Sequence, residues 1–256
     1  MSRSLLLWAS IVFNFSLSAL PYGNPSSPSI LQQGFVISDT ATANLKFGML
    51  EIPYYYPDIK INHRDRRLSY MNPTASGGGV LGQVTLNIKE RVELIASIGA
   101  EQMGVTYSYS NIKRHYDVQG FLMGSLGGKL VFIEIGNWTL GLGALVYYGE
   151  GSPTAYYEND IPSSTGNVSF IHKGWQAGGA LSYRAGWLIP YFGLMGRDYR
   201  MEMKNLQERD ELMLYPSSHL DFFVGATIAT VYKVSLEIES HFINDSMLSF
   251  LMQIRF

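Results

Sequence analysis

The stretch that decides the fold is residues 80–100, which read VLGQVTLNIKERVELIASIGA. Apolar and polar side chains alternate through residues 80–88 and again through residues 92–100, with a polar turn, Lys89-Glu90-Arg91, between them. A period of two is typical of a β-strand with one apolar face, so this pattern predicts a hairpin. Strands of about ten residues with this alternation are those that a transmembrane β-barrel uses.

The same alternation recurs along the rest of the chain. It is found at residues 45–50, 122–132, 139–146, 175–184, 191–197, 220–228, 234–239 and 248–256. Together with the opening hairpin, these segments predict an all-β fold, an antiparallel transmembrane β-barrel of about ten strands. Twelve strands are the alternative, because residues 54–70 have room for a further hairpin.

The links between these segments alternate in length. Short links fall at 89–91, 134–137, 185–188 and 230–233, long polar links fall at 53–78, 106–117, 150–168 and 200–216, and a last link at 243–246 is again brief. Outer-membrane barrels have short periplasmic turns and longer external loops. We therefore expect both chain ends on the periplasmic side.

The placement of tyrosine and tryptophan favours a membrane barrel over a water-soluble β-sandwich, which also has alternating strands. One group falls near the long links and a second near the short links, as expected for belts at the two membrane interfaces. The first group is Tyr54, Tyr55, Tyr56, Tyr107, Tyr109, Tyr148, Tyr156, Tyr157 and Tyr199, and the second is Trp138, Trp187 and Tyr232.

The N-terminus has the pattern of a secretory signal peptide. Arg3 precedes an apolar run from Leu5 to Phe15, and small residues follow up to Ala19. We expect cleavage after Ala19, which gives a signal peptide at 1–19, an N-terminal periplasmic segment at 20–41 and a barrel at 42–256 in the cell outer membrane. The chain of 256 residues has no cysteine, so no disulfide holds it, and its net charge of −2 gives no reason to expect nucleic acid.

The polar faces of the predicted strands would point into the barrel. Many residues on these faces are small, among them Gly141, Gly178, Gly193 and Gly225, and small side chains would leave space for water. The pattern leaves two interpretations open, an interlocked salt-bridge plug or a narrow polar constriction with weak charge preference. The residues expected to line the lumen are Lys46, Gln83, Thr85, Asn87, Glu93, Lys129, Gln176, Arg184, Arg197, Asp221, Glu237, Glu239 and Arg255.

Several motifs, in collinear order, resemble the major outer membrane porins of Chlamydiae. They lie at residues 20–29 (LPYGNPSSPS), 86–91 (LNIKER), 99–100, 175–177, 180–184, 190–193, 224–228 and 253–256 (QIRF). The resemblance covers nearly the whole mature chain and implies an outer-membrane barrel that passes ions and small hydrophilic solutes. This chain would be a short member without the family's cysteines, which argues against a disulfide-based envelope role. The terminal Phe256 on an amphipathic last strand also resembles the signal read by the general outer-membrane assembly machinery.

No motif indicates catalysis. Residues 124–129 superficially resemble a phosphate loop, but Met123 stands where its first glycine belongs and Leu130 replaces the Ser or Thr. The histidines fall near predicted loops, and no spacing among them defines a catalytic or metal site. We therefore expect no enzyme, no cofactor and no metal. The histidines are His63, His115, His172, His219 and His241.

The sequence thus predicts a porin for passive diffusion of ions and small hydrophilic solutes. The alternative is a non-conducting barrel that presents surface loops as an adhesin or antigen, or that serves as an envelope structural protein. The expected partners are outer-membrane lipid, the assembly machinery, small polar solutes and ions, with a homo-oligomer as a further option.

Overall fold

The computed structural model describes residues 23–24, 35–38, 41–56, 59–61, 70–89, 91–109, 111–206, 209–229, 234–242 and 246–255. Within these ranges, no helix is long and apolar enough to cross a membrane. The regular structure of the described residues is β-sheet, and all of its strand pairings are antiparallel.

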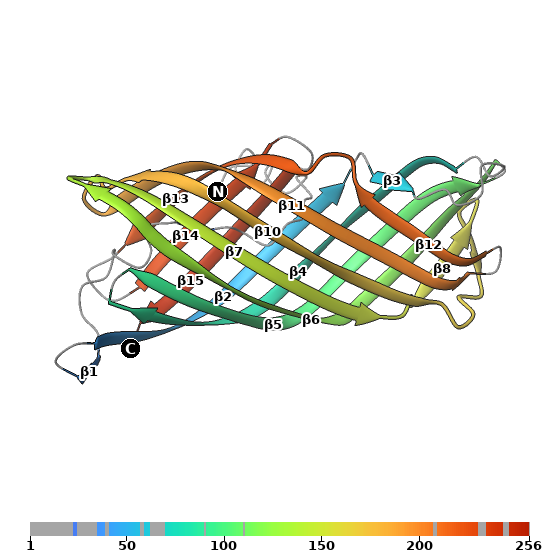
Figure 1. The fold of residues 1–256 in the computed structure, drawn as a ribbon. Helices are drawn as coiled ribbons and strands as arrows, with labels where there is room; N and C mark the ends of the chain where they lie inside the picture. Colours follow the sequence, from blue (N-terminus) through green and yellow to red (C-terminus); the bar gives the residue numbers. More distant parts are fainter. Residues whose placement is uncertain are drawn as a thin grey trace, which may run out of the picture.

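Among the described residues, ten strands pair into a closed ring, which confirms the predicted strand number (Figure 1). The ring closes because its first strand pairs with its last. The ring strands are β2 (Ala41–Tyr56), β4 (Tyr70–Ile88), β5 (Val92–Tyr109), β6 (Ile112–Ile135), β7 (Trp138–Gly151), β10 (Ser169–Tyr183), β11 (Leu188–Leu206), β13 (Leu220–Ala229), β14 (Val234–His241) and β15 (Ser246–Arg255).

The seam of the ring lies between β2 and β15, where Tyr55 is opposite Ser246 and Gly48 is opposite Gln253. The other neighbours in the ring are consecutive ring strands, so the barrel has the simple up-and-down topology. The strands cross the barrel obliquely, as closing a sheet into a barrel requires. Figure 1 shows the shorter strands β8 (Ala155–Glu158) and β12 (Arg209–Pro216) at one end, and β1 (Phe35–Ser38) with the C-terminus at the other.

The hairpin at residues 80–100 forms as its alternation predicts. Val80 lies opposite Ala100 and Ile88 lies opposite Val92, so residues 80–100 keep one register throughout the hairpin. Lys89 has a φ of 52°, a left-handed conformation that lets a tight turn reverse the chain. Another predicted short link turns at Gly136, whose φ of 59° suits a residue without a Cβ.

The apolar faces point outward, which identifies the barrel as one that crosses a membrane. Ile98, Leu122 and Leu126 are 61%, 64% and 63% exposed, whereas Gln83 and Thr85 on the other faces are buried. A surface covered with exposed apolar side chains is unfavourable in water and favourable in lipid. A closed ring also satisfies every strand edge, as the hydrocarbon layer demands.

Several long links that the sequence predicts as loops are instead continuations of the strands. Residues 106–117 form the end of the β5–β6 hairpin, in which Tyr109 lies opposite Ile112. Residues 200–216 form the end of β11 and the strand β12, and residues 150–168 include β8 and the short strand β9 (Ile161–Ser163). The prediction of irregular loops was wrong here, because polar residues alternate in a solvated strand as they do in a loop.

These continuations build a second section at the end of the barrel away from the short turns, which we call the outer section (Figure 1). β11 pairs with β13 over residues 188–196 but with β12 over residues 201–206, so β12 takes the place of the shorter β13. β12 pairs in turn with β3 (Ile59–Ile61), and β8 pairs with β6. In the described part of residues 54–70, β3 has three residues and joins no additional ring hairpin, so the twelve-strand alternative is wrong.

A bulge at Gly120 separates the two sections on β6. Val118 and Phe121 both point inward, although three positions apart, and the register with β5 shifts between Glu101 and Met103. Gly120 has a φ of 64°, as the glycine of such a bulge requires. Even-numbered residues face the interior before the bulge and odd-numbered residues face it after the bulge. A single alternation therefore cannot describe the whole strand.

The N-terminal part of the described chain lies in two places. β1 pairs with the start of β2. Gly23 and Asn24, by contrast, are buried in the barrel interior, where they bond to side chains of β13 and β14. The sequence places residues 20–41 in a periplasmic segment, and the structure has these two of them inside the barrel.

Candidate functional site: the barrel interior

A network of ionisable side chains lies in the interior of the section with the short turns. Asp221 on β13 forms an ion pair with Arg197 at 3.5 Å and lies 2.6 Å from His241 Nδ1. The other ring nitrogen of His241, Nε2, lies 2.8 Å from Glu239 on β14. All of these groups are buried. These hydrogen-bond and ion-pair contacts connect the strands β11, β13 and β14.

The network continues through Tyr191 to a second carboxylate, that of Glu237. The Tyr191 hydroxyl lies 3.0 Å from Glu239 Oε2 and 3.2 Å from Glu237 Oε1. Thr227 donates to Glu237 at 3.3 Å. On another part of the wall, Lys129 lies 3.9 Å from Glu93. The interior of this section therefore contains a polar network in which charges of both signs meet, beside buried apolar side chains such as Met195 and Phe223.

The interior of the outer section is apolar and aromatic, which the sequence did not predict. Tyr116 stacks on Tyr156 with ring centroids 4.4 Å apart and faces Tyr107 at 6.2 Å. Phe121 meets Phe170 edge to face at 5.4 Å. The remaining buried side chains of this cluster include Met103, Val105, Met201, Met203, Leu212 and Leu214.

This cluster overturns part of the predicted aromatic belts. Tyr107, Tyr156 and Tyr199 are buried in the interior rather than placed at a membrane interface. Trp138 and Trp187 at the short turns are 48% and 64% exposed, as belt residues should be. Tyr232 lies outside the described residues, and so do the side chains of Tyr54, Tyr55 and Tyr56.

Two of the small inward residues make room for large neighbouring side chains. A Cβ placed on Gly225 would overlap the Tyr191 side chain, and one on Gly193 would lie 2.6 Å from the Phe223 ring. Close packing of this kind fills the interior of small barrels. The expectation that small residues leave space for water was wrong at these two positions.

The predicted lining residues fall into three groups. Arg184 lies at the short-turn rim, where it is 3.7 Å from Glu134. Lys46 and Arg255 lie opposite each other in the β2–β15 pairing, but their side chains lie outside the description, as does Phe256. The others are buried in the interior: Gln83, Thr85, Asn87, Glu93, Lys129, Gln176, Arg197, Asp221, Glu237 and Glu239.

The sequence reasoning missed four interior residues that complete the polar network. His241 follows Glu237 and Glu239 at intervals of two, so strand periodicity could have found it. Tyr191 shares its face with Gly193 and Arg197 and could have been found in the same way. Gly23 and Asn24 lie outside every predicted strand, and no local pattern marks them as interior residues.

Histidine and carboxylate groups also meet on the outer section. His115 lies 2.7 Å from Thr106 Oγ1 and 2.8 Å from Asp117, on partly exposed side chains. His172 is buried 3.5 Å from Glu101. His63 lies outside the described residues. Among the residues that are described, no group of three or more such side chains could hold a metal ion.

A cluster on β8 ties this short strand to β6. Arg114 donates to Glu158 at 3.3 Å, and the Tyr156 hydroxyl donates to the same carboxylate. The Tyr156 hydrogen bond is the main cause that holds the pKa of Glu158 below its ordinary value, and the charge of Arg114 adds to it. Burial and the same hydrogen bond raise the pKa of Tyr156.

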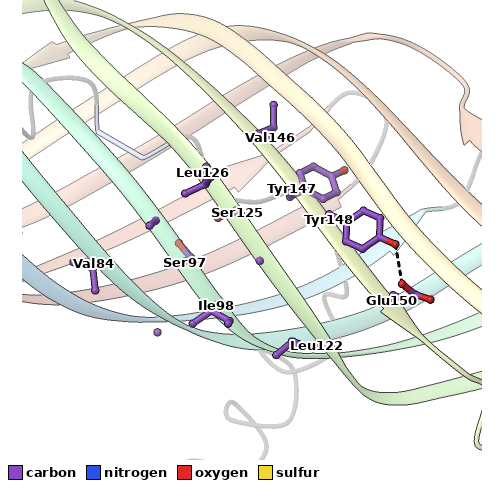
Figure 2. A pocket seen from close by; sticks show the side chains of 13 residues that line it. Val84, Ser97, Ile98, Leu122, Ser125, Leu126, Val146, Tyr147, Tyr148 and Glu150 are labelled. Atoms are coloured by element: carbon purple, nitrogen blue, oxygen red, sulfur yellow. Dashed lines mark hydrogen bonds between the residues drawn. The ribbon is translucent and has the colours of Figure 1, made fainter.

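One hollow lies against exposed apolar side chains of the outer wall (Figure 2). It has a volume of about 710 Å³ and lies between exposed apolar side chains such as Val84, Ile98 and Leu122. Figure 2 shows Tyr148 beside it, donating a hydrogen bond of 2.9 Å to Glu150. The exposed apolar side chains of this hollow face lipid.

No protein-family model matches the sequence, and no curated protein matches it. Among solved structures, the chain is similar to the outer membrane protease OmpT from Escherichia coli, with 9% identity, a TM-score of 0.40, and coverage of 88% of this chain and 99% of that one. It is similar to the CymD monoaromatic hydrocarbon channel, with 11% identity, a TM-score of 0.31, and coverage of 91% and 90%. A triple mutant of the Rhodopseudomonas blastica porin has 10% identity, a TM-score of 0.18, and coverage of 84% and 100%.

These likenesses concern the fold alone. The class of the protein follows from its own architecture, because a closed antiparallel ring with apolar side chains outside and polar side chains inside is suited to a lipid bilayer. The protein is an outer-membrane β-barrel.

Proposed function

We propose that the protein is a narrow porin that lets ions and small hydrophilic solutes diffuse passively, and that the described structure is its closed state. The observation that supports this proposal is the buried ionisable network from Arg197 to Glu237. Buried ion pairs add little net stability compared with apolar packing, so a purely structural barrel gains little from them. A path for polar solutes needs such groups, because they replace the hydration of the solute.

The packed interior supports a closed state for this pore. Most of the described inward residues of both sections are buried, and a barrel of ten strands is only slightly wider than one that side chains fill completely. The apolar outer section would act as a second barrier in series with the polar one, because narrow apolar constrictions exclude water. We expect openings to be small and infrequent.

Charge selectivity tests this proposal at the level of single residues. Lys129→Met removes a positive charge from the interior and is expected to increase the preference for cations, while Glu93→Gln is expected to increase the preference for anions. The reversal potential in a salt gradient across a planar bilayer measures both shifts. Lys113→Gln is the control, since Lys113 is half exposed on the outer section, where it pairs with Asp160. Reversal potentials that stay unchanged in both interior variants would place these residues away from the path.

A non-conducting platform is the second candidate, and the aromatic core of the outer section favours it. This core gives the strands beyond the Gly120 bulge a stable interior, as a surface for host or envelope contacts would need. Replacing residues 155–163 with a short glycine-serine linker removes β8 and β9. If the platform is the function, cell-surface binding disappears while the heat-modifiable gel mobility of the folded barrel is kept. Binding that survives this replacement would argue against β8 and β9 as the contact surface.

The remaining expectations from the sequence are part of the same proposal. They are the absence of catalysis, cleavage after Ala19, assembly through the C-terminal strand, and kinship with the major outer membrane porins of Chlamydiae. The collinear motifs support the kinship, and the amphipathic pattern of β15 supports the assembly signal.

A further inference from the structure

Gly23 and Asn24 are held by Lys129, Thr227, Glu237 and Glu239 in the section of the barrel with the short turns, the polar section. We call this binding site the seat. The Gly23 N–H donates to Glu239 Oε2 at 2.8 Å, and the Asn24 N–H donates to Glu237 Oε1 at 2.9 Å. The Asn24 side chain donates to Thr227 Oγ1 at 2.8 Å, and Asn24 is fully buried. The Lys129 ammonium lies 3.5 Å from the Asn24 carbonyl oxygen. Groups from β6, β13 and β14 therefore hold this dipeptide.

The chemistry of the seat matches a peptide backbone. Two successive main-chain N–H groups meet two carboxylates that are two residues apart on β14, and the following carbonyl meets a cation. Hydrogen bonds to charged groups are the stronger kind, and here each contributes to holding the segment. The carboxylates of Glu237 and Glu239 also share the Tyr191 hydroxyl, so the same seat belongs to the polar network.

Glycine is required at position 23 for two reasons. Its φ of 71° lies in the left-handed region that side chains disfavour. A Cβ there would overlap Lys129 Nζ and lie 2.6 Å from Glu237 Oε1. The close fit of the backbone to these groups indicates a built binding site rather than a chance contact.

We propose that Gly23 and Asn24 act as an internal plug, and that Glu237, Glu239, Thr227 and Lys129 form the site that binds it. While the plug is bound, its backbone N–H groups satisfy the two carboxylates and occupy part of the polar section near the short turns. When the plug leaves, these groups form hydrogen bonds with water and with solutes that pass through the barrel. The seat itself is independent of the porin proposal, whereas its effect on permeation rests on that proposal.

The absence of native cysteine makes thiol protection a direct test of the seat. Asn24→Cys in the full chain, folded in detergent micelles, is expected to react with a water-soluble maleimide far more slowly than Asn137→Cys at the exposed β6–β7 turn. Heat-modifiable gel mobility verifies that both variants are folded. Equal reaction rates at the two positions would overturn the plug.

A second variant unseats the plug without touching the barrel wall. Gly23→Val forces a β-branched side chain into the left-handed region and against Lys129, so labelling of Asn24→Cys should rise about tenfold or more in this background. Unchanged protection in the folded double variant would contradict the proposed seat.

Single-channel recording then separates the plug from the pore. Gly23→Val is expected to raise the frequency of openings in planar bilayers above that of the wild type. Protection that is lost in Gly23→Val without any change in conductance would confirm the seat and overturn its role in permeation. If neither protein conducts while protection still depends on Gly23, the porin proposal fails and the binding site stands.

Discussion

Gly225 and Tyr191 show how the interior is filled at the scale of single residues. Tyr191 of β11 lies over Gly225, its partner on the neighbouring β13, and brings its hydroxyl to two carboxylates of β14. A Cβ at position 225 would overlap this tyrosine. A glycine within a strand interior normally weakens the strand. Here the cost is offset by the packing and the hydrogen bonds of the tyrosine.

Gly225→Ala is therefore expected to destabilise the barrel by about 1–3 kcal/mol, the usual range for overpacking a filled interior. Its Cβ would overlap the Tyr191 ring, and the hydroxyl would have to leave Glu237 and Glu239. Equilibrium urea unfolding in micelles measures the free energy of unfolding. Gly82→Ala is the matched control, since a Cβ there has its nearest contact at 3.7 Å. Equal stability of the two variants would contradict the close packing.

Strand periodicity predicted the polar wall residue by residue but could not predict what fills the space between the walls. Gln83, Thr85, Asn87, Glu93 and Lys129 face inward as their alternation indicates. Whether such residues border water or one another depends on how side chains of neighbouring strands pack, such as Tyr191 of β11 over Gly225 of β13. A single sequence carries no signal for that pairing, nor for the entry of Gly23 and Asn24 from outside the ring.

At the scale of elements, the bulge at Gly120 explains why the outer section escaped prediction. Residues 122–130 follow a polar-inside pattern, but Tyr116 and Val118 beyond the bulge place apolar side chains inside. A strand whose inward face changes parity and polarity has no single period to detect. In the membrane section, apolar side chains face outward to the lipid. In the outer section, apolar side chains face inward, as in the core of a protein that folds in water.

The attachment of β8 to β6 is expected to depend on acid pH. The folded-state pKa of Glu158 lies below its ordinary value of about 4.5, so the stabilisation is complete above that pH and is lost as pH falls through the lower folded value. Pulsed hydrogen exchange of residues 155–163 after incubation at each pH measures the attachment. We expect protection to be constant from pH 7 to pH 5 and to fall on further acidification.

Glu158→Gln provides the control for this prediction. It keeps the shape of the side chain but removes the charge that meets Arg114. Exchange of the variant should therefore be faster than that of the wild type from pH 7 to pH 5, with no acid step. A loss of protection centred above pH 6 in the wild type would show that another group controls the attachment.

At the scale of the whole molecule, the barrel has two sections in series with different interiors. The section with short turns has a polar network and an apolar outer wall, and the section beyond Gly120 has an aromatic core. Most of the described inward side chains of both sections are buried. The number of strands and the membrane-facing surface followed from the sequence, because both depend on local alternation that the bilayer enforces.

The conductance of single molecules in a planar bilayer, compared with a sixteen-stranded porin under the same conditions, tests the central claim most directly. Ten strands with a filled interior predict brief steps far smaller than those of the wider barrel, whose interior is an aqueous channel. Steps as large as those of the sixteen-stranded porin would contradict the closed ring of ten strands. The complete absence of steps from protein that is verified as folded would contradict the pore.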